Sequence, residues 1–238
     1  GSAMGIYHFE GIAPSDKIIC RYINKDVQYG SMRMRFASAL DADVDGDGVE
    51  ELVVGGYKNT GIGGICDVGT LDPSKNLLQL FRWNESSRRY EEACSTPKEV
   101  EARSSLIQTD AQMMEPAAMA AGRLYTNDRM DRIFLEGNIF GFHGERGHLS
   151  EGSFVKEHSI SLGGGSRSFI SDAYAGSFSM GGMDTEQIVL LCGSFSGNSD
   201  KATMDVLWIW QDDRGKLNDA ITNADHPGGT GRYPTPCP

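Results

Sequence analysis

Three short apolar runs, each ending in glycine, restrict the fold of this sequence more than any other feature. The runs are Leu52–Gly55, Ile133–Gly137 and Ile188–Gly193. Each contains β-branched or aromatic side chains and is too short for a buried helix, so each predicts a buried strand. The three runs share a form, and each is preceded at close range by acidic or amide side chains, which indicates a repeated structural environment.

The likeness between the three regions extends in both directions along the chain. A further short segment ends 11 or 12 residues before each run. These segments are Ala39–Asp41, Ala120–Gly122 and Tyr174–Gly176. Aromatic alternating runs, Leu77–Trp83 and Asp205–Trp210, follow two of the anchors and lead into polar turns. The pattern predicts four short strands per repeat.

The spacing of the repeats favours a radial arrangement of β-sheets. The first residues of the runs, Leu52, Ile133 and Ile188, are 81 and 55 positions apart, more than the period of helical or leucine-rich repeats. One all-β domain over residues 6–225 is expected, with residues 1–5 as a remnant of cloning and 226–238 as an extended tail. Residues 98–121 also have helix-forming composition, so that stretch stays open between helix and strand.

Charge and composition exclude several classes of function. The net charge of -11 argues against a nonspecific hold on nucleic acid, which needs cationic side chains. No run of 18 apolar residues occurs, so the sequence predicts no membrane span. The five cysteines form no CxxC pair, which argues against a zinc or redox centre. An acidic chain does suit hard cations.

The strongest chemical signal is the acidic loop that leads into the first apolar run. Alternate carboxylates at Asp43, Asp45 and Asp47 can converge on one point if the chain curls, and Gly48 gives the backbone that freedom. Ca²⁺ takes six to eight such oxygen ligands. An EF-hand would need Glu at the twelfth position, where Leu52 or Val54 stands. The loop therefore predicts a calcium site that opens a strand.

The segment from Asp43 to Gly55, with the pattern D-x-D-x-D-G-x-x-E followed by an apolar strand, resembles the FG-GAP or VCBS-type repeats. These are the calcium-binding blades of integrin-α-like β-propellers. The resemblance implies β-propeller-type blades of four antiparallel strands and a structural Ca²⁺. It implies side-chain ligands from Asp43, Asp45, Asp47 and Glu51, with the Val49 carbonyl as a further ligand. The family more often has Asp where Glu51 stands.

The other two repeats depart from that motif. Leu124 and Thr126 replace the early carboxylates in the second loop, and Phe178 and Met180 replace them in the third. Both loops are expected to be free of metal and braced by apolar side chains. Because propellers have four to eight blades, 238 residues and about three repeats predict a small or incomplete propeller.

The tryptophans and histidines raise an alternative function. Trp83, Trp208 and Trp210 are possible ligand-facing aromatics, and with His143 they suggest a carbohydrate-active enzyme or its sugar-binding accessory domain. The glycine-rich segment around His143 and His148 is also typical of a solvated hairpin tip. The serine- and glycine-rich loops match neither a nucleophile elbow nor a phosphate-binding loop, so the sequence assigns no catalytic residue.

Together these features predict an extracellular calcium-binding module, secreted or on the cell surface, that serves in binding or interaction. Its ligand is expected to be a protein or a carbohydrate, and whether it is an enzyme stays open. An open arc of sheets would leave strand edges unpaired, which favours self-association or a partner chain that supplies further blades.

Overall fold

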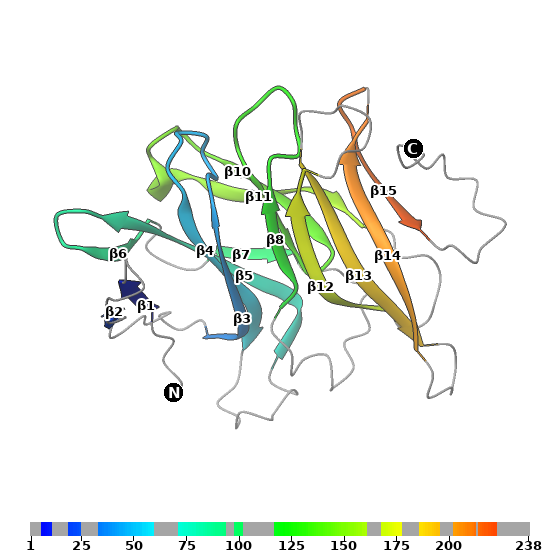
Figure 1. The fold of residues 1–238 in the computed structure, drawn as a ribbon, viewed down its shortest axis with the longest axis horizontal. Coiled ribbons are helices and arrows are strands. Elements are labelled where there is room, and N and C mark those ends of the chain that lie inside the picture. The colour runs from blue at the N-terminus through cyan, green and yellow to red at the C-terminus, as the bar shows by residue number, and fades with distance from the viewer. Residues whose placement is uncertain are drawn as a thin grey trace.

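Three antiparallel sheets make up most of the structure (Figure 1). The computed structural model describes residues 6–10, 19–24, 33–59, 71–93, 98–101, 117–160, 168–177, 186–195, 202–212 and 214–222. Strands predominate in these ranges, and the single helical element is the 3₁₀ turn Leu149–Glu151. The predicted all-β class is therefore confirmed. Within these ranges no helix is long and apolar enough to cross a membrane.

The first sheet contains β3 (Arg33–Ala42), β4 (Glu51–Asn59), β5 (Leu71–Asn84) and β6 (Arg89–Glu92) in that order. A fifth strand, β7 (Lys98–Glu101), pairs with the first half of β5, while β6 pairs with its second half. The amide of Ala93 continues the ladder by donating to the Leu80 carbonyl at 3.0 Å. Strands β6 and β7 thus line the same edge of β5.

The second and third sheets repeat this four-strand order. The second contains β8 (Met119–Gly122), β9 (Arg132–Leu135), β10 (Asn138–His143) and β11 (Ser153–Ser159). The third contains β12 (Ser168–Gly176), β13 (Gln187–Phe195), β14 (Ala202–Gln211) and β15 (Leu217–Thr222). Neighbouring strands are antiparallel throughout.

The sequence repeats correspond to these sheets. The three glycine-ended runs lie in β4, in β9 with its following turn, and in β13, which are the second strands. The segments upstream of them lie at the ends of β3, β8 and β12, and the two aromatic runs fall in the third strands β5 and β14. The prediction of four strands per repeat is confirmed.

The second sheet lies between the other two and is covered on both faces. Ile133, Leu135 and Phe140 pack with Val53 and Leu80 of the first sheet. From the opposite face, side chains of β9 and β10 pack with strands of the third sheet. These residues are Phe134, Ile139, Ile188, Leu190, Leu207 and Ile209. Two hydrophobic clusters, one on each side of the central sheet, therefore hold the three sheets together.

A pair of hydrogen bonds joins each sheet to the next at the loop after its first strand. Asp43, directly after β3, donates its amide to Asp131 Oδ2 at 2.9 Å and accepts from the Asp131 amide at 2.8 Å. Arg123, directly after β8, makes the same two bonds with Glu186, at 2.7 and 2.9 Å. Asp131 and Glu186 each immediately precede the second strand of the following sheet. This repeated clamp holds successive loops in register.

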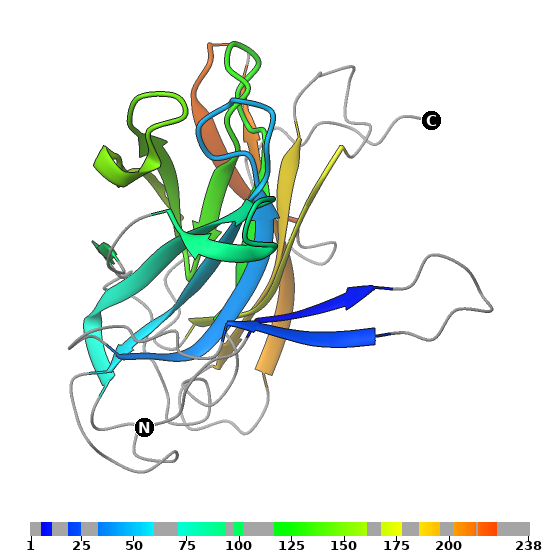
Figure 2. The same ribbon diagram turned by 90° about the vertical axis from the view of Figure 1, so that its left-hand side faces the viewer.

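The first strands β3, β8 and β12 lie side by side in the middle of the molecule, and β8 contacts both of the others (Figure 1). The β3–β4, β8–β9 and β10–β11 loops lie toward one end of the sheets (Figure 2). Strands β1 (Ile6–Glu10) and β2 (Ile19–Asn24) form a separate antiparallel ribbon that projects to one side (Figure 2). The loop end that contains the acidic motif is therefore a shared rim.

Some sequence predictions lie partly or wholly outside the described residues. Residues 1–5 and the expected tail 226–238 are among them, as are Phe178 and Met180 of the third loop. The stretch 98–121 begins with β7 and ends within β8, so its described ends are strands, and residues 102–116 lie outside the described ranges.

Candidate metal centre

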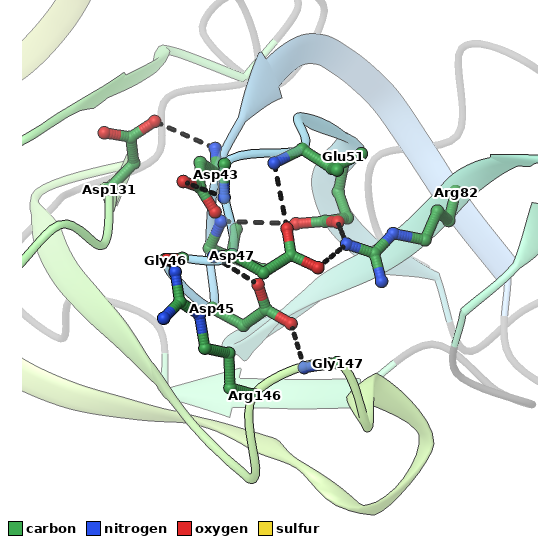
Figure 3. Close-up of polar contacts among 12 residues, drawn as sticks. Asp43, Asp45, Gly46, Asp47, Glu51, Arg82, Asp131, Arg146 and Gly147 are labelled. Atoms are coloured by element: carbon green, nitrogen blue, oxygen red, sulfur yellow. Dashed lines mark hydrogen bonds and ion pairs between the residues drawn. The ribbon is translucent and has the colours of Figure 1, made fainter.

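The acidic loop between β3 and β4 curls as its sequence predicts. Gly46 and Gly48 adopt φ angles of 73° and 89°, a left-handed backbone that few residues other than glycine accept. The Gly48 amide donates to Asp43 Oδ2 at 2.9 Å, and the Asp47 amide donates to Asp45 Oδ1 at 3.1 Å. These bonds within the loop turn the carboxylates of Asp43 and Asp45 inward (Figure 3).

Three of the predicted ligands come together. Asp43, Asp45 and Glu51 each offer a carboxylate oxygen, and these oxygens lie within 4.8 Å of one another. Glu51 is fully buried as the first residue of β4, and Asp45 is 6% exposed. Such a group of hard oxygen atoms fits Ca²⁺ better than a softer metal.

The hydrogen bonding of these carboxylates is incomplete. Asp43 Oδ1 and Glu51 Oε1 are buried and accept no hydrogen bond, although Glu51 Oε1 forms an ion pair with Arg82 Nη2 at 2.9 Å. The other oxygen of Glu51 accepts from the Val44 amide at 3.2 Å. Buried carboxylate oxygens without donors are costly unless a cation neutralises them. The converging carboxylates and the unpartnered Asp43 Oδ1 therefore fit a bound divalent cation.

Asp47, a fourth predicted ligand, lies outside this converging group. Asp47 Oδ1 accepts from the Val49 amide at 2.8 Å, and Asp47 Oδ2 contacts Nη2 of Arg82 (Figure 3). Although partial burial opposes it, the Val49 amide and the Arg82 guanidinium lower the pKa of Asp47 below its usual value. Val49 is 49% exposed, and its carbonyl as a ligand stays a prediction.

Several residues that the sequence did not single out complete the site. Arg82 of β5 also lies 2.9 Å from Glu51 Oε1. From the second sheet, the Gly147 amide donates to Asp45 Oδ2 at 2.8 Å and Arg146 donates to the Gly46 carbonyl. The β10–β11 loop, predicted to be a solvated hairpin tip, thus also forms one wall of the acidic loop (Figure 3).

The tryptophans lie in two separate sheets. Trp83 of β5 is partly buried and meets the Tyr90 ring edge-on, with centroids 5.3 Å apart. Trp208 and Trp210 are partly buried on β14 of the third sheet. Since the second sheet separates them from Trp83, the three rings form no common surface.

Trp83 lines a groove of about 460 Å³ next to the acidic loop. One side of the groove is the β5–β6 hairpin, with Arg82, Glu85 and Glu92, and the other is the β10–β11 loop from Gly147 to Ser150. His148 lines that second side, whereas His143 is exposed, 3.5 Å from Glu157 Oε1. Arg82 and Gly147 line the groove and also contact the acidic loop.

The second loop combines the expected apolar brace with a buried arginine. Leu124 is fully buried, as expected of an apolar brace. Arg132, which begins β9, is also buried and donates to Asp128, to the Met130 carbonyl and to Glu157. A buried guanidinium therefore supports this loop in addition to apolar packing, because its fork of donors satisfies several acceptors at once.

Glu51 makes the ion-free loop sensitive to pH. Burial raises its pKa to about 7, against the opposing effect of Arg82. The folded state then holds a proton that the unfolded state releases, so in EDTA the free energy of unfolding should fall as pH rises from about 4.5 to 7. One group shifted this far contributes about 3 kcal/mol.

Urea unfolding at pH 5.0 and 7.5 in EDTA checks this expectation. In Glu51→Gln the fall in stability between these two pH values should be smaller by about 2 kcal/mol, since glutamine does not titrate and the interval covers most of the effect. An equal fall in wild type and variant would exclude Glu51 as the source.

Comparison of the chain with family models, with curated proteins and with solved structures gave no match in any of the three cases. The resemblance to FG-GAP repeats accordingly stays a prediction that rests on the loop motif and its spacing.

Proposed function

We propose that the protein is a calcium-binding interaction module in which one structural Ca²⁺ braces the rim between the first and second sheets. The observation that carries this proposal is the convergence of Asp43, Asp45 and Glu51, in which the buried Asp43 Oδ1 accepts no hydrogen bond. Asp43, Asp45 and Glu51 would hold the ion, which would neutralise their mutual repulsion. Asp47 and the Val49 carbonyl would complete its coordination.

We further propose that the three sheets are blades of an incomplete, propeller-type arc. The identical strand order, the adjacent first strands β3, β8 and β12, and the repeated clamp support this arrangement. Two positions that correspond to the clamp residues lie at the ends of the arc. They are Glu50, which precedes the second strand of the first sheet, and Ser177, which follows the first strand of the third sheet, and both are exposed. Self-association through open edges stays a prediction. The outer strand β11 carries Lys156, Glu157 and His158, and such charges discourage edge pairing.

The groove beside the acidic loop supports the binding role. Its lining includes Glu85, Glu91 and Glu92 against the single arginine Arg82. A basic segment of a protein partner would complement that charge. Because Gly147 hydrogen-bonds Asp45 and also lines the groove, an ion in the loop would fix the position of the groove wall. Abundant extracellular Ca²⁺ would suit a secreted or cell-surface location.

The partial burial of all three tryptophans favours this module over the carbohydrate-active alternative. A sugar-cleaving site of the kind considered would present flat, exposed rings beside a pair of carboxylates. Trp83 instead meets Tyr90 at an interplanar angle of 70°.

Thermal melting in EDTA and then in millimolar CaCl₂ tests the metal site. A ligand that binds only the folded state at about 100 times its Kd adds about 2.7 kcal/mol. For a chain of this size we expect the Tm to rise by about 5–10 °C. Asp45→Asn with Asp47→Asn should abolish the rise and retain the β-sheet circular dichroism spectrum.

The matched control, Glu145→Ala with Glu151→Ala, removes two negative charges outside the acidic loop. Both side chains are exposed on the β10–β11 loop, and their removal should leave the calcium response unchanged. A calcium-dependent rise of equal size in the Asp45 and Asp47 double variant would refute the site.

A further inference from the structure

The loops of the first and second sheets match position by position. Asp47, Val49 and Glu51 stand 81 residues before Asp128, Met130 and Arg132. Both loops also contain the same local bond, in which the aspartate accepts from the amide two residues later. The distance is 2.8 Å from Val49 to Asp47 and 3.2 Å from Met130 to Asp128. Arg132 therefore occupies the place of the predicted ligand Glu51.

In the second loop the Arg132 guanidinium binds the counterparts of two predicted calcium ligands. Its Nη1 and Nη2 donate to the two oxygens of Asp128 at 3.2 and 2.8 Å. Nη1 also donates to the Met130 carbonyl at 3.1 Å. Because the Arg132 side chain is only 6% exposed, this charge is a permanent part of the loop. In the second loop, which lacks the early carboxylates, a guanidinium thus provides the positive charge that a bound ion would provide in the first loop.

The first loop has a guanidinium as well, delivered from a different strand. Arg82 of β5 contacts Asp47 Oδ2 and lies 2.9 Å from Glu51 Oε1. With its other oxygen bonded to the Val49 amide, Asp47 has both oxygens engaged, and it stands outside the converging triad. The Arg82 side chain is 26% exposed, so it has a route to solvent that Arg132 lacks.

We propose that Arg82 is a built-in counter-cation of the acidic loop that competes with Ca²⁺ for Asp47 and Glu51. Without the ion, Arg82 pairs with both side chains and keeps the loop folded. When the ion binds, Arg82 releases Asp47, which turns inward to join the other ligands. The reason is electrostatic, since two cations that share the same carboxylates repel each other. This inference rests on the proposed calcium site.

Titration of CaCl₂ into the protein by calorimetry tests the competition. Arg82→Met removes the charge and retains much of the side-chain volume, and it should bind Ca²⁺ about ten-fold more tightly than wild type. The same variant should melt at a lower temperature than wild type in EDTA, because Asp47 and Glu51 lose their counter-charge. Arg89→Met is the control. Arg89 is an exposed arginine at the start of β6 that pairs with Glu91, and the variant should leave the calcium affinity unchanged.

The outcomes separate the two proposals. Equal or weaker calcium affinity in Arg82→Met, with clear binding by wild type, would overturn the competition and leave the site intact. Binding by neither protein would overturn the site itself and the competition with it. If Arg82→Met does not fold in EDTA, Arg82→Lys replaces it. A single ammonium cannot span both carboxylates as a guanidinium does, so tighter binding than wild type supports the competition and equal or weaker binding refutes it.

Discussion

Replacing Arg132 by methionine is expected to lower the free energy of unfolding by about 3 kcal/mol. The guanidinium lies 2.8 Å from Asp128 Oδ2 and 2.9 Å from Glu157 Oε2. It also stacks over the Tyr125 ring at 4.5 Å from the centroid. Removing it leaves two carboxylates close together in a partly buried site without their cation. The loss lies at the lower end for a buried pair because Asp128 is 26% exposed and stays partly solvated.

Urea unfolding at pH 7 measures this loss, and two further variants interpret it. Arg132→Lys keeps the charge but loses the fork that binds both oxygens of Asp128, so it should be intermediate. Arg214→Met changes an exposed arginine of the β14–β15 turn and should shift stability by less than about 0.5 kcal/mol. If Arg132→Met were as stable as the Arg214 variant, the buried cluster would contribute nothing to the second loop.

Truncating Phe134 to alanine is expected to cost about 3–5 kcal/mol. Phe134 is a fully buried side chain of the central sheet, on the face that packs against the third sheet. Its removal leaves a cavity between the second and third sheets. The strands of a sheet cannot move one by one to fill that cavity. The loss of dispersion contacts then adds to the lost burial of the ring.

Phe154→Ala provides the comparison for Phe134→Ala. Phe154 lies on the outer strand β11, is partly buried and meets Phe142 edge-on with centroids 5.5 Å apart. Its truncation should cost less, because part of the space is open to solvent. Equal losses in the two variants, measured by urea unfolding, would contradict the arrangement in which the central sheet is covered on both faces.

The strands and the acidic loop could be predicted from local sequence because both depend on local patterns. Alternation of apolar side chains defines β5 and β14, and the glycine-ended runs mark β4, β9 and β13. Loop curvature follows from glycine at positions 46 and 48, where the backbone is left-handed. The sequence therefore determined the all-β class, four strands in each repeat, and the convergence of Asp43, Asp45 and Glu51, but it also placed Asp47 in that group, which Arg82 holds outside it.

The charged partners of these carboxylates were decided only by the tertiary structure. Arg82 reaches Asp47 from 35 residues away, and Gly147 reaches Asp45 from 102 residues away. Such contacts depend on strand register and on how the sheets pack, and no spacing in the sequence encodes them. Arg132 shows the same limit. Its sequence position corresponds to that of the predicted ligand Glu51. Only the tertiary structure shows that its guanidinium binds Asp128 and the Met130 carbonyl, the acceptors that a cation would bind.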